Sequence, residues 1–92
     1  MNSELKTRWI EALLSGKYEQ GIGQLKDNKG RYCCLGVLRD IAGITKNQCR
    51  DEMGVIDKLK HEVSRTEQYR LAQMNDNGSS FIQIAQYIEE NL

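Results

Sequence analysis

Residues 15–36, with the sequence SGKYEQGIGQLKDNKGRYCCLG, combine glycines with positively charged side chains, a combination suited to anion binding. The cations are Lys17, Lys26, Lys29 and Arg31. A glycine-rich backbone presents accessible N–H groups and the cations add charge, so the segment is a candidate phosphate site. The GIG at 21–23 lacks the strand–GxGxxG–helix context of a dinucleotide fingerprint, and no GKS or GKT follows it.

A second candidate anion site lies at Ser79 and Ser80, where the last amphipathic segment begins. Backbone N–H groups at a helix N-terminus point outward and attract negative charge. Both candidate sites also have a simpler interpretation, as an ordinary hairpin turn and an ordinary capped helix. Considered alone, the simpler interpretation is favoured at each position.

The sequence indicates neither a metal centre nor a catalytic centre. Zinc sites need four ligands in close pairs, whereas the chain has a single histidine, His61, and no CxxC. His61 lies in a charged stretch and is interpreted as a surface residue, and no serine has the nucleophile-elbow sequence of a Ser-His-acid triad. The paired carboxylates at 51–52 and 89–90 are typical of polar helix faces and ends. We therefore expect a protein that is not an enzyme and that uses no metal or cofactor.

Charge and composition bound the classes of partner. With 13 basic and 13 acidic residues the net charge is zero, so we do not expect nucleic acid, which usually needs a basic face. No segment approaches the ~20 apolar residues of a membrane span, and no signal peptide is recognised, which favours the cytoplasm. Cys33 and Cys34 are interpreted as buried small hydrophobic residues, with a redox role as the less favoured alternative.

The apolar periodicity predicts a single α+β domain over residues 1–92, with an N-terminal helix, a β-hairpin and then three or so helices. Trp9 lies on the apolar stripe of the first helix, at 3–15, and is expected in the core rather than against a ligand. Residues 18–34 are predicted to form the hairpin around a turn at 26–30, because the first arm alternates and Asp, Asn and Gly suit the turn. Gly21 and Gly23 leave one face of that arm open to another backbone or a ligand.

Further helices are predicted at 35–43 and after capping boxes that begin at Ser64 and Ser80. Residues 44–63 are the least readable, although Ile56, Leu59 and Val63 suggest a helix and Thr45 suits the cap of a short turn.

The last segment, GSSFIQIAQYI, is also typical of the first helix of a helix-turn-helix. A DNA reader needs a recognition helix after it, but the residues that follow are Glu89, Glu90, Asn91 and Leu92. A small DNA-binding regulator therefore stays as an alternative function. A protein-binding inhibitor of a host enzyme, acting through an exposed apolar face, is a second alternative.

Three motifs resemble a widespread family of small phage-encoded proteins. The chain contains W–x–x–A–L–x–S–G–K–Y–x–Q from Trp9, Y–C–C–L–G–V–L from Tyr32 and N–D–x–G–x–S–F–x–x–I–A–x–Y–I from Asn75. The resemblance covers residues 5–43 and 71–92, and residues 44–70 depart from it. It implies a phage anti-defence "sponge", which binds a cyclic-nucleotide immune signal in the host cytoplasm and sequesters it without cleavage. It also implies a homo-oligomer with ligand sites between subunits.

On that resemblance, seven residues are candidates for the ligand site. They are Lys17, Tyr18, Gln20, Arg31, Asn75, Asp76 and Ser79. Cations would pair with phosphate, the tyrosine would stack on a base, and the amide and carboxylate groups would bind base or ribose edges. Each residue has a structural alternative: packing across the hairpin for Tyr18, support of the sheet for Gln20, and turn formation for Asn75 and Asp76.

Overall fold

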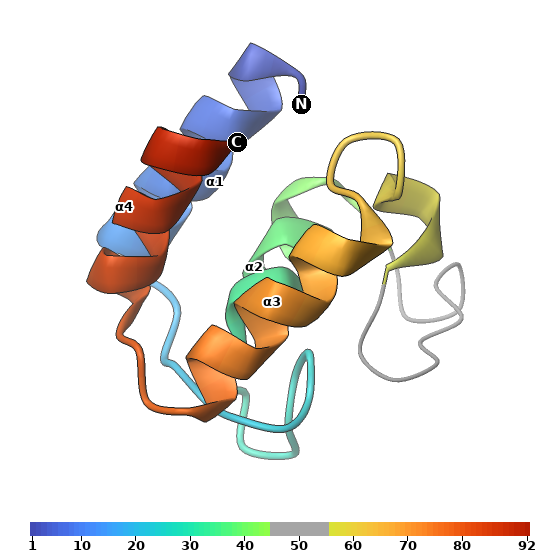
Figure 1. The fold of residues 1–92 in the computed structure, drawn as a ribbon. Helices are drawn as coiled ribbons and strands as arrows, with labels where there is room; N and C mark the ends of the chain where they lie inside the picture. Colours follow the sequence, from blue (N-terminus) through green and yellow to red (C-terminus); the bar gives the residue numbers. More distant parts are fainter. Residues whose placement is uncertain (45–55) are drawn as a thin grey trace.

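The described residues, 1–44 and 56–92 of the computed structural model, form a helical domain (Figure 1). The elements are α1 (Ser3–Leu14), α2 (Cys34–Ile41), the 3-10 turn η2 (Asp57–Leu59), α3 (Arg65–Asp76) and α4 (Phe81–Asn91). Helix α1 packs beside α4, α2 packs beside α3, and α1 also contacts α2. The two helix pairs enclose one core between them.

Trp9 is fully buried in this core, which confirms the position predicted for it. Its indole Nε1 donates a hydrogen bond to the carbonyl oxygen of Cys34 at 3.0 Å. The bond satisfies the one polar atom of a large apolar side chain and ties α1 to the start of α2.

Two helix starts were predicted from capping boxes. Ser80 and Gln83 form the complete box, in which each side chain accepts a hydrogen bond from the backbone N–H of the other residue. Ser64 also caps its helix, but the Glu67 side chain accepts from the Tyr87 hydroxyl instead, at 3.0 Å. The local capping signal therefore located both helix starts, and tertiary packing redirected one side chain.

The predicted α+β class is wrong, because the described residues contain no strand and no β-hairpin. Residues 15–33 form a loop with two isolated bridges, Gln20 to Tyr32 and Lys26 to Tyr32. The turn at its tip does form: Gly30 N donates to Asp27 O at 3.1 Å. Further from the turn, Tyr32 N donates to Glu19 O and Gly21 N donates to Tyr32 O, both at 2.8 Å, but these bonds form one isolated bridge and not a continuous ladder along two arms.

The loop fails to become a hairpin because α3 takes up its backbone groups. Gly21 O accepts a hydrogen bond from the Asn75 side chain at 2.8 Å, and Gly23 N donates to the Asp76 carboxylate at 3.0 Å. A backbone group that is paired with a side chain is no longer available to a strand ladder. Gly23 also has a φ of +78°, which bends the arm that was predicted to be extended.

A second buried amide organises the chain before α3. The Gln68 side chain accepts from Ile56 N at 2.6 Å and donates to Ile56 O and Val63 O, at 3.1 and 2.9 Å. Leu59, in η2, is buried together with Ile56 and Val63. The helix that the spacing of these three residues suggested is only a short 3-10 turn in the structure. The predicted cap at Thr45 lies outside the described residues.

Cys33 and Cys34 are both buried, as expected for small core residues. The Cys34 thiol donates to Leu71 O at 3.5 Å. Burial raises the pKa of this thiol well above its usual value, which keeps it protonated and unreactive.

None of the helices in the ranges 1–44 and 56–92 combines the length and the apolar character needed to cross a membrane. The same ranges contain no group of His, Cys, Asp and Glu side chains arranged to hold a metal ion.

Candidate ligand-binding site

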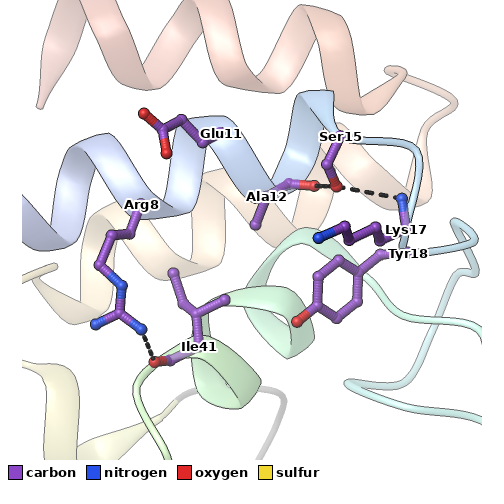
Figure 2. A pocket seen from close by; sticks show the side chains of 7 residues that line it. All are labelled: Arg8, Glu11, Ala12, Ser15, Lys17, Tyr18 and Ile41. Atoms are coloured by element: carbon purple, nitrogen blue, oxygen red, sulfur yellow. Dashed lines mark hydrogen bonds between the residues drawn. The ribbon is translucent and has the colours of Figure 1, made fainter.

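A hollow of about 370 Å³ lies where the end of α1, the end of α2 and the start of the 15–33 loop meet (Figure 2). It is lined by Arg8, Glu11, Ala12, Ser15, Lys17, Tyr18 and Ile41. The volume is within the range of small-molecule sites, at its lower end.

Helix α1 forms one wall because Arg8, Glu11, Ala12 and Ser15 recur at intervals of three and four residues. Residues with this spacing share one face of a helix. The guanidinium of Arg8 is oriented by a hydrogen bond from Nη2 to the carbonyl oxygen of Ile41 at 2.8 Å (Figure 2). This bond uses one of five N–H donors and leaves the others for a ligand.

The chain turns back after α1 so that its next side chains form the opposite wall. Ser15 Oγ donates to Ala12 O at 2.7 Å and accepts from Lys17 N at 3.2 Å. Gly16, with a φ of +77°, takes the left-handed conformation that commonly ends a helix. Lys17 and Tyr18 therefore project back towards α1 and α2 (Figure 2).

Tyr18 is held in a single orientation. Its hydroxyl donates to the Asp40 carboxylate, and its ring packs edge-on against Tyr32, with centroids 4.9 Å apart and an interplanar angle of 88°. The hydrogen bond to Asp40, together with partial desolvation, raises the pKa of Tyr18 to about 12. The phenol is therefore neutral at physiological pH and forms a rigid, largely apolar wall.

The remaining charges of the hollow are uncommitted. Within the described part of the chain, neither the Lys17 ammonium nor the Glu11 carboxylate has a hydrogen-bond or ion-pair partner. Together with Arg8 they leave one net positive charge on the lining residues. The hollow thus offers cationic donors and apolar surface from Tyr18 and Ile41 to a ligand, whereas the Glu11 carboxylate projects from α1 away from Lys17, Tyr18 and Ile41 (Figure 2).

Gln20 and Asn75 meet each other, but in a buried network away from the hollow. Asn75 is fully buried, and its Oδ1 accepts from Gln20 Nε2 at 3.0 Å and from Cys34 N at 3.2 Å. Gln20 Nε2 also donates to Ser79 O at 2.7 Å, and Gln20 Oε1 accepts from Phe81 N at 3.2 Å. These amides join the loop to the starts of α2 and α4 and have no group directed at a ligand.

The candidate anion site at Ser79 and Ser80 has few free donors. Ser79 N donates to Met74 O at 2.9 Å, and Ser80 N donates to the Gln83 side chain, also at 2.9 Å. Phe81 N is taken by Gln20 as described above. The N-terminus of α4 is therefore satisfied by its own surroundings.

Two further candidate residues are engaged elsewhere. The Asp76 carboxylate accepts from Gly23 N, and Arg31 Nε forms an ion pair with the Asp27 carboxylate at 2.7 Å. Of the seven candidates, only Lys17 and Tyr18 line the hollow.

Sequence reasoning missed Arg8 and Glu11, which are the other two charged residues lining the hollow. Their spacing from Ser15 was visible in the sequence and predicts a shared helix face. That face also resembles an ordinary solvated surface, and only the approach of Ile41 and Tyr18 makes it a wall.

Comparisons with curated proteins and with solved structures each gave no match. A family model described as a domain of unknown function, DUF8296, matches residues 1–61, a segment that contains every residue lining the hollow. Since this match covers more than half of the 92 residues, the chain belongs to the DUF8296 family.

Proposed function

We propose that the protein is a non-enzymatic phage anti-defence protein that binds a cyclic-nucleotide signal in the hollow and sequesters it. The proposal rests on the resemblance of its three motifs to small phage proteins and on the hollow itself. The observation that carries it is that two cations lie beside the apolar wall of Tyr18. Arg8 is oriented by its hydrogen bond to Ile41 O, and the Lys17 ammonium has no partner among the described residues.

The charge of the hollow suits a phosphodiester. A cyclic nucleotide carries one negative charge per nucleotide unit, and the lining residues carry one net positive charge. Tyr18 and Ile41 provide the apolar surface against which a base packs. A ligand with several phosphate charges on one nucleotide fits this balance less well.

We also propose that the protein acts in the host cytoplasm as a homo-oligomer. The hollow has the volume for about one nucleotide unit, so the second half of a cyclic dinucleotide would extend beyond it. A second copy of the chain is the natural partner for that half. Light scattering with and without ligand measures the expected assembly.

A thermal-shift panel of cyclic and linear nucleotides tests the function. A ligand that binds only the folded state raises the melting temperature in proportion to its saturation. We expect a rise with at least one cyclic nucleotide, and recovery of that nucleotide intact after heat denaturation. Recovery of a hydrolysed product would instead show an enzyme.

Substitution of Lys17 by Gln connects the binding to the hollow. Removing one cation from a partly exposed site weakens binding of a phosphodiester by about tenfold, on the scale of one near-surface charge pair. Lys29→Gln is the matched control, because Lys29 is an exposed cation in the same loop but does not line the hollow. Equal effects of the two substitutions would show that the ligand binds elsewhere.

The alternative functions give different results in the same preparation. Salt-sensitive retention of duplex DNA without any response to nucleotides would show a DNA-binding regulator. Copurification with one host enzyme, again without a nucleotide response, would show a protein-binding inhibitor.

A further inference from the structure

Two large apolar side chains, Leu14 and Ile82, are exposed to solvent on the α1–α4 helix pair. Leu14 is the last residue of α1 and is 53% exposed, and Ile82 is the second residue of α4 and is 68% exposed. A single exposed apolar residue needs no explanation, whereas apolar residues that gather on one face indicate an interaction surface. The positions of these two side chains relative to each other therefore matter.

Leu14 and Ile82 lie at the same level of an antiparallel helix pair. Helices α1 and α4 run side by side in opposite directions (Figure 1). The register is set at one end of the pair, where Lys6 Nζ donates to Glu89 O at 3.1 Å. Leu14 follows Lys6 by eight residues, or ~12 Å, and Ile82 precedes Glu89 by seven residues, or ~10.5 Å. The two apolar side chains therefore lie together at the other end of the pair.

Helical spacing places these residues along the line where α1 and α4 adjoin. On α1, Lys6, Ile10 and Leu14 recur every four residues and form one stripe, and its lysine reaches across to α4. On α4, Ile82 and Glu89 are seven residues apart, which is close to two full turns. We call these five residues the α1–α4 face. It is apolar at the end with Leu14, half-buried at Ile10 and charged at the end with Lys6.

A two-fold axis parallel to the helices makes the α1–α4 face complementary to itself. Such an axis places α1 of one copy against α4 of the other and keeps matching ends level. Leu14 then faces the partner's Ile82, and Lys6 faces the partner's Glu89. Lys6 uses one donor on Glu89 O of its own chain and keeps two others for the second carboxylate. An axis perpendicular to the helices would instead place the apolar end against the charged end.

We propose that the α1–α4 face is the interface of a homodimer in which the helices of two copies form an antiparallel four-helix arrangement. Each helix in this arrangement has antiparallel neighbours, as in four-helix bundles with short connections. The inference deepens the proposed function, on which it rests for the expectation of a homo-oligomer. The dimer needs no nucleotide, because the hollow lies on the side of α1 that faces α2.

The size of the face determines how strong this dimer is. The two helices have 12 and 11 residues, so they are ~18 and ~16 Å long, and each is about 10 Å wide. The face therefore measures roughly 300–400 Å² in projection, which is less than the about 800 Å² per partner of a standard interface. We expect a reversible dimer with a dissociation constant on the order of 10–100 µM.

Sedimentation equilibrium between about 1 and about 500 µM protein, without nucleotide, tests the inference. The average mass should rise with concentration from the 10.6 kDa of one chain towards twice that value. Leu14→Glu and Ile82→Glu each place a charge in the apolar end of the face and should keep the protein monomeric throughout. Ile22→Glu is the matched control, because Ile22 is 65% exposed and its two neighbouring residues bond to α3. This variant should dimerise as the wild type does.

Exchange of charges tests the direction of the two-fold axis. Lys6→Glu alone places glutamates opposite each other across the dimer, and Glu89→Lys alone places lysines opposite each other. Each variant should therefore dimerise at least about threefold more weakly than the wild type. A mixture of the two variants restores an opposite-charge pair at both positions and should regain the wild-type affinity. Circular dichroism melting checks that every variant folds.

The outcomes decide between this interface and its alternatives. A chain that stays monomeric up to about 500 µM would overturn the proposal. Dimers that survive Leu14→Glu and Ile82→Glu, or that Ile22→Glu disrupts equally, would show a different interface. A mixture of the charge variants that dimerises no better than either alone would refute the axis. Nucleotide binding is measured separately by thermal shift, so the proposed ligand and the proposed interface can fail independently.

Discussion

Asn75 offers the sharpest test of how the loop is held, because its side chain joins three separate segments. It is fully buried, accepts hydrogen bonds from Gln20 Nε2 and Cys34 N, and donates to Gly21 O. Replacement by alanine removes all three bonds at once. Gln20 keeps its bonds to Ser79 and Phe81, whereas Cys34 N and Gly21 O lose their only hydrogen-bond partners among residues 1–44 and 56–92.

The expected loss of stability follows from the two backbone groups that are left without a partner, Cys34 N and Gly21 O. A buried backbone donor or acceptor without a partner costs about 1–3 kcal/mol, and partial relaxation keeps the sum below the maximum, so we expect a loss of about 2–4 kcal/mol. A 92-residue domain has a free energy of unfolding on the order of 5–14 kcal/mol. Asn75→Ala should therefore remove a large share of the total stability.

Urea denaturation measures this loss, with the fluorescence of the single tryptophan, Trp9, as the probe of the core. Asn77→Ala is the matched control: Asn77 lies two residues away, at the exposed end of α3, and should change stability by about 0.5 kcal/mol or less. A double-mutant cycle with Gln20→Ala should give a coupling energy of about 0.5–3 kcal/mol, as expected for residues in one network.

A loss of less than about 1 kcal/mol in Asn75→Ala, with an unchanged denaturant slope, would refute the structural role argued here. If such a variant also lost nucleotide binding, Asn75 would act at a ligand site, as the motif resemblance implies. The same two measurements therefore decide between the structural and the binding interpretation of this residue.

Two other substitutions test separate contacts. Gly36→Ala places a Cβ 1.7 Å from the carbonyl oxygen of Leu25. This should cost about 2 kcal/mol or more, against the gain of about 1 kcal/mol that alanine usually brings to a helix, and a raised urea midpoint would contradict the packing. Tyr18→Phe removes the bond to Asp40 and should cost about 1 kcal/mol at neutral pH. Because the pKa of Tyr18 is raised from 10.0 to about 12, the stability difference between wild type and Tyr18→Phe should be full below pH 10 and vanish as the pH rises through 12. Urea titrations across this range check it, and a difference that stays constant through pH 12 would contradict it.

Local signals in the sequence located the helices well. The Ser80 capping box, the left-handed glycine after α1 and the apolar stripe through Trp9 each involve residues within a turn or two of one another. Interactions of this range are encoded in neighbouring residues, so pattern and capping chemistry identify them without knowledge of the rest of the chain.

The hairpin was predicted wrongly because the signals for it are also local, whereas the side chains that take up its backbone groups lie far away in the sequence. The turn residues near Asp27 do form a turn, yet Gly21 and Gly23 bond to side chains more than fifty positions later. The hollow was missed for the same reason, since Arg8 becomes part of a wall only when Ile41 and Tyr18 approach it.

The sequence by itself thus indicated the segments of α1, α2, α3 and α4 and their apolar faces, because these properties depend on neighbours along the chain, whereas the helix suggested by Ile56, Leu59 and Val63 is only a short 3-10 turn. Only the tertiary structure decided that residues 15–33 form a loop bonded to α3 and that the α1 face, Ile41 and the Lys17–Tyr18 segment enclose a hollow. The physical reason is that a backbone hydrogen bond or a cavity wall needs two partners. Here the second partner comes from a distant part of the chain, and only folding brings it into place.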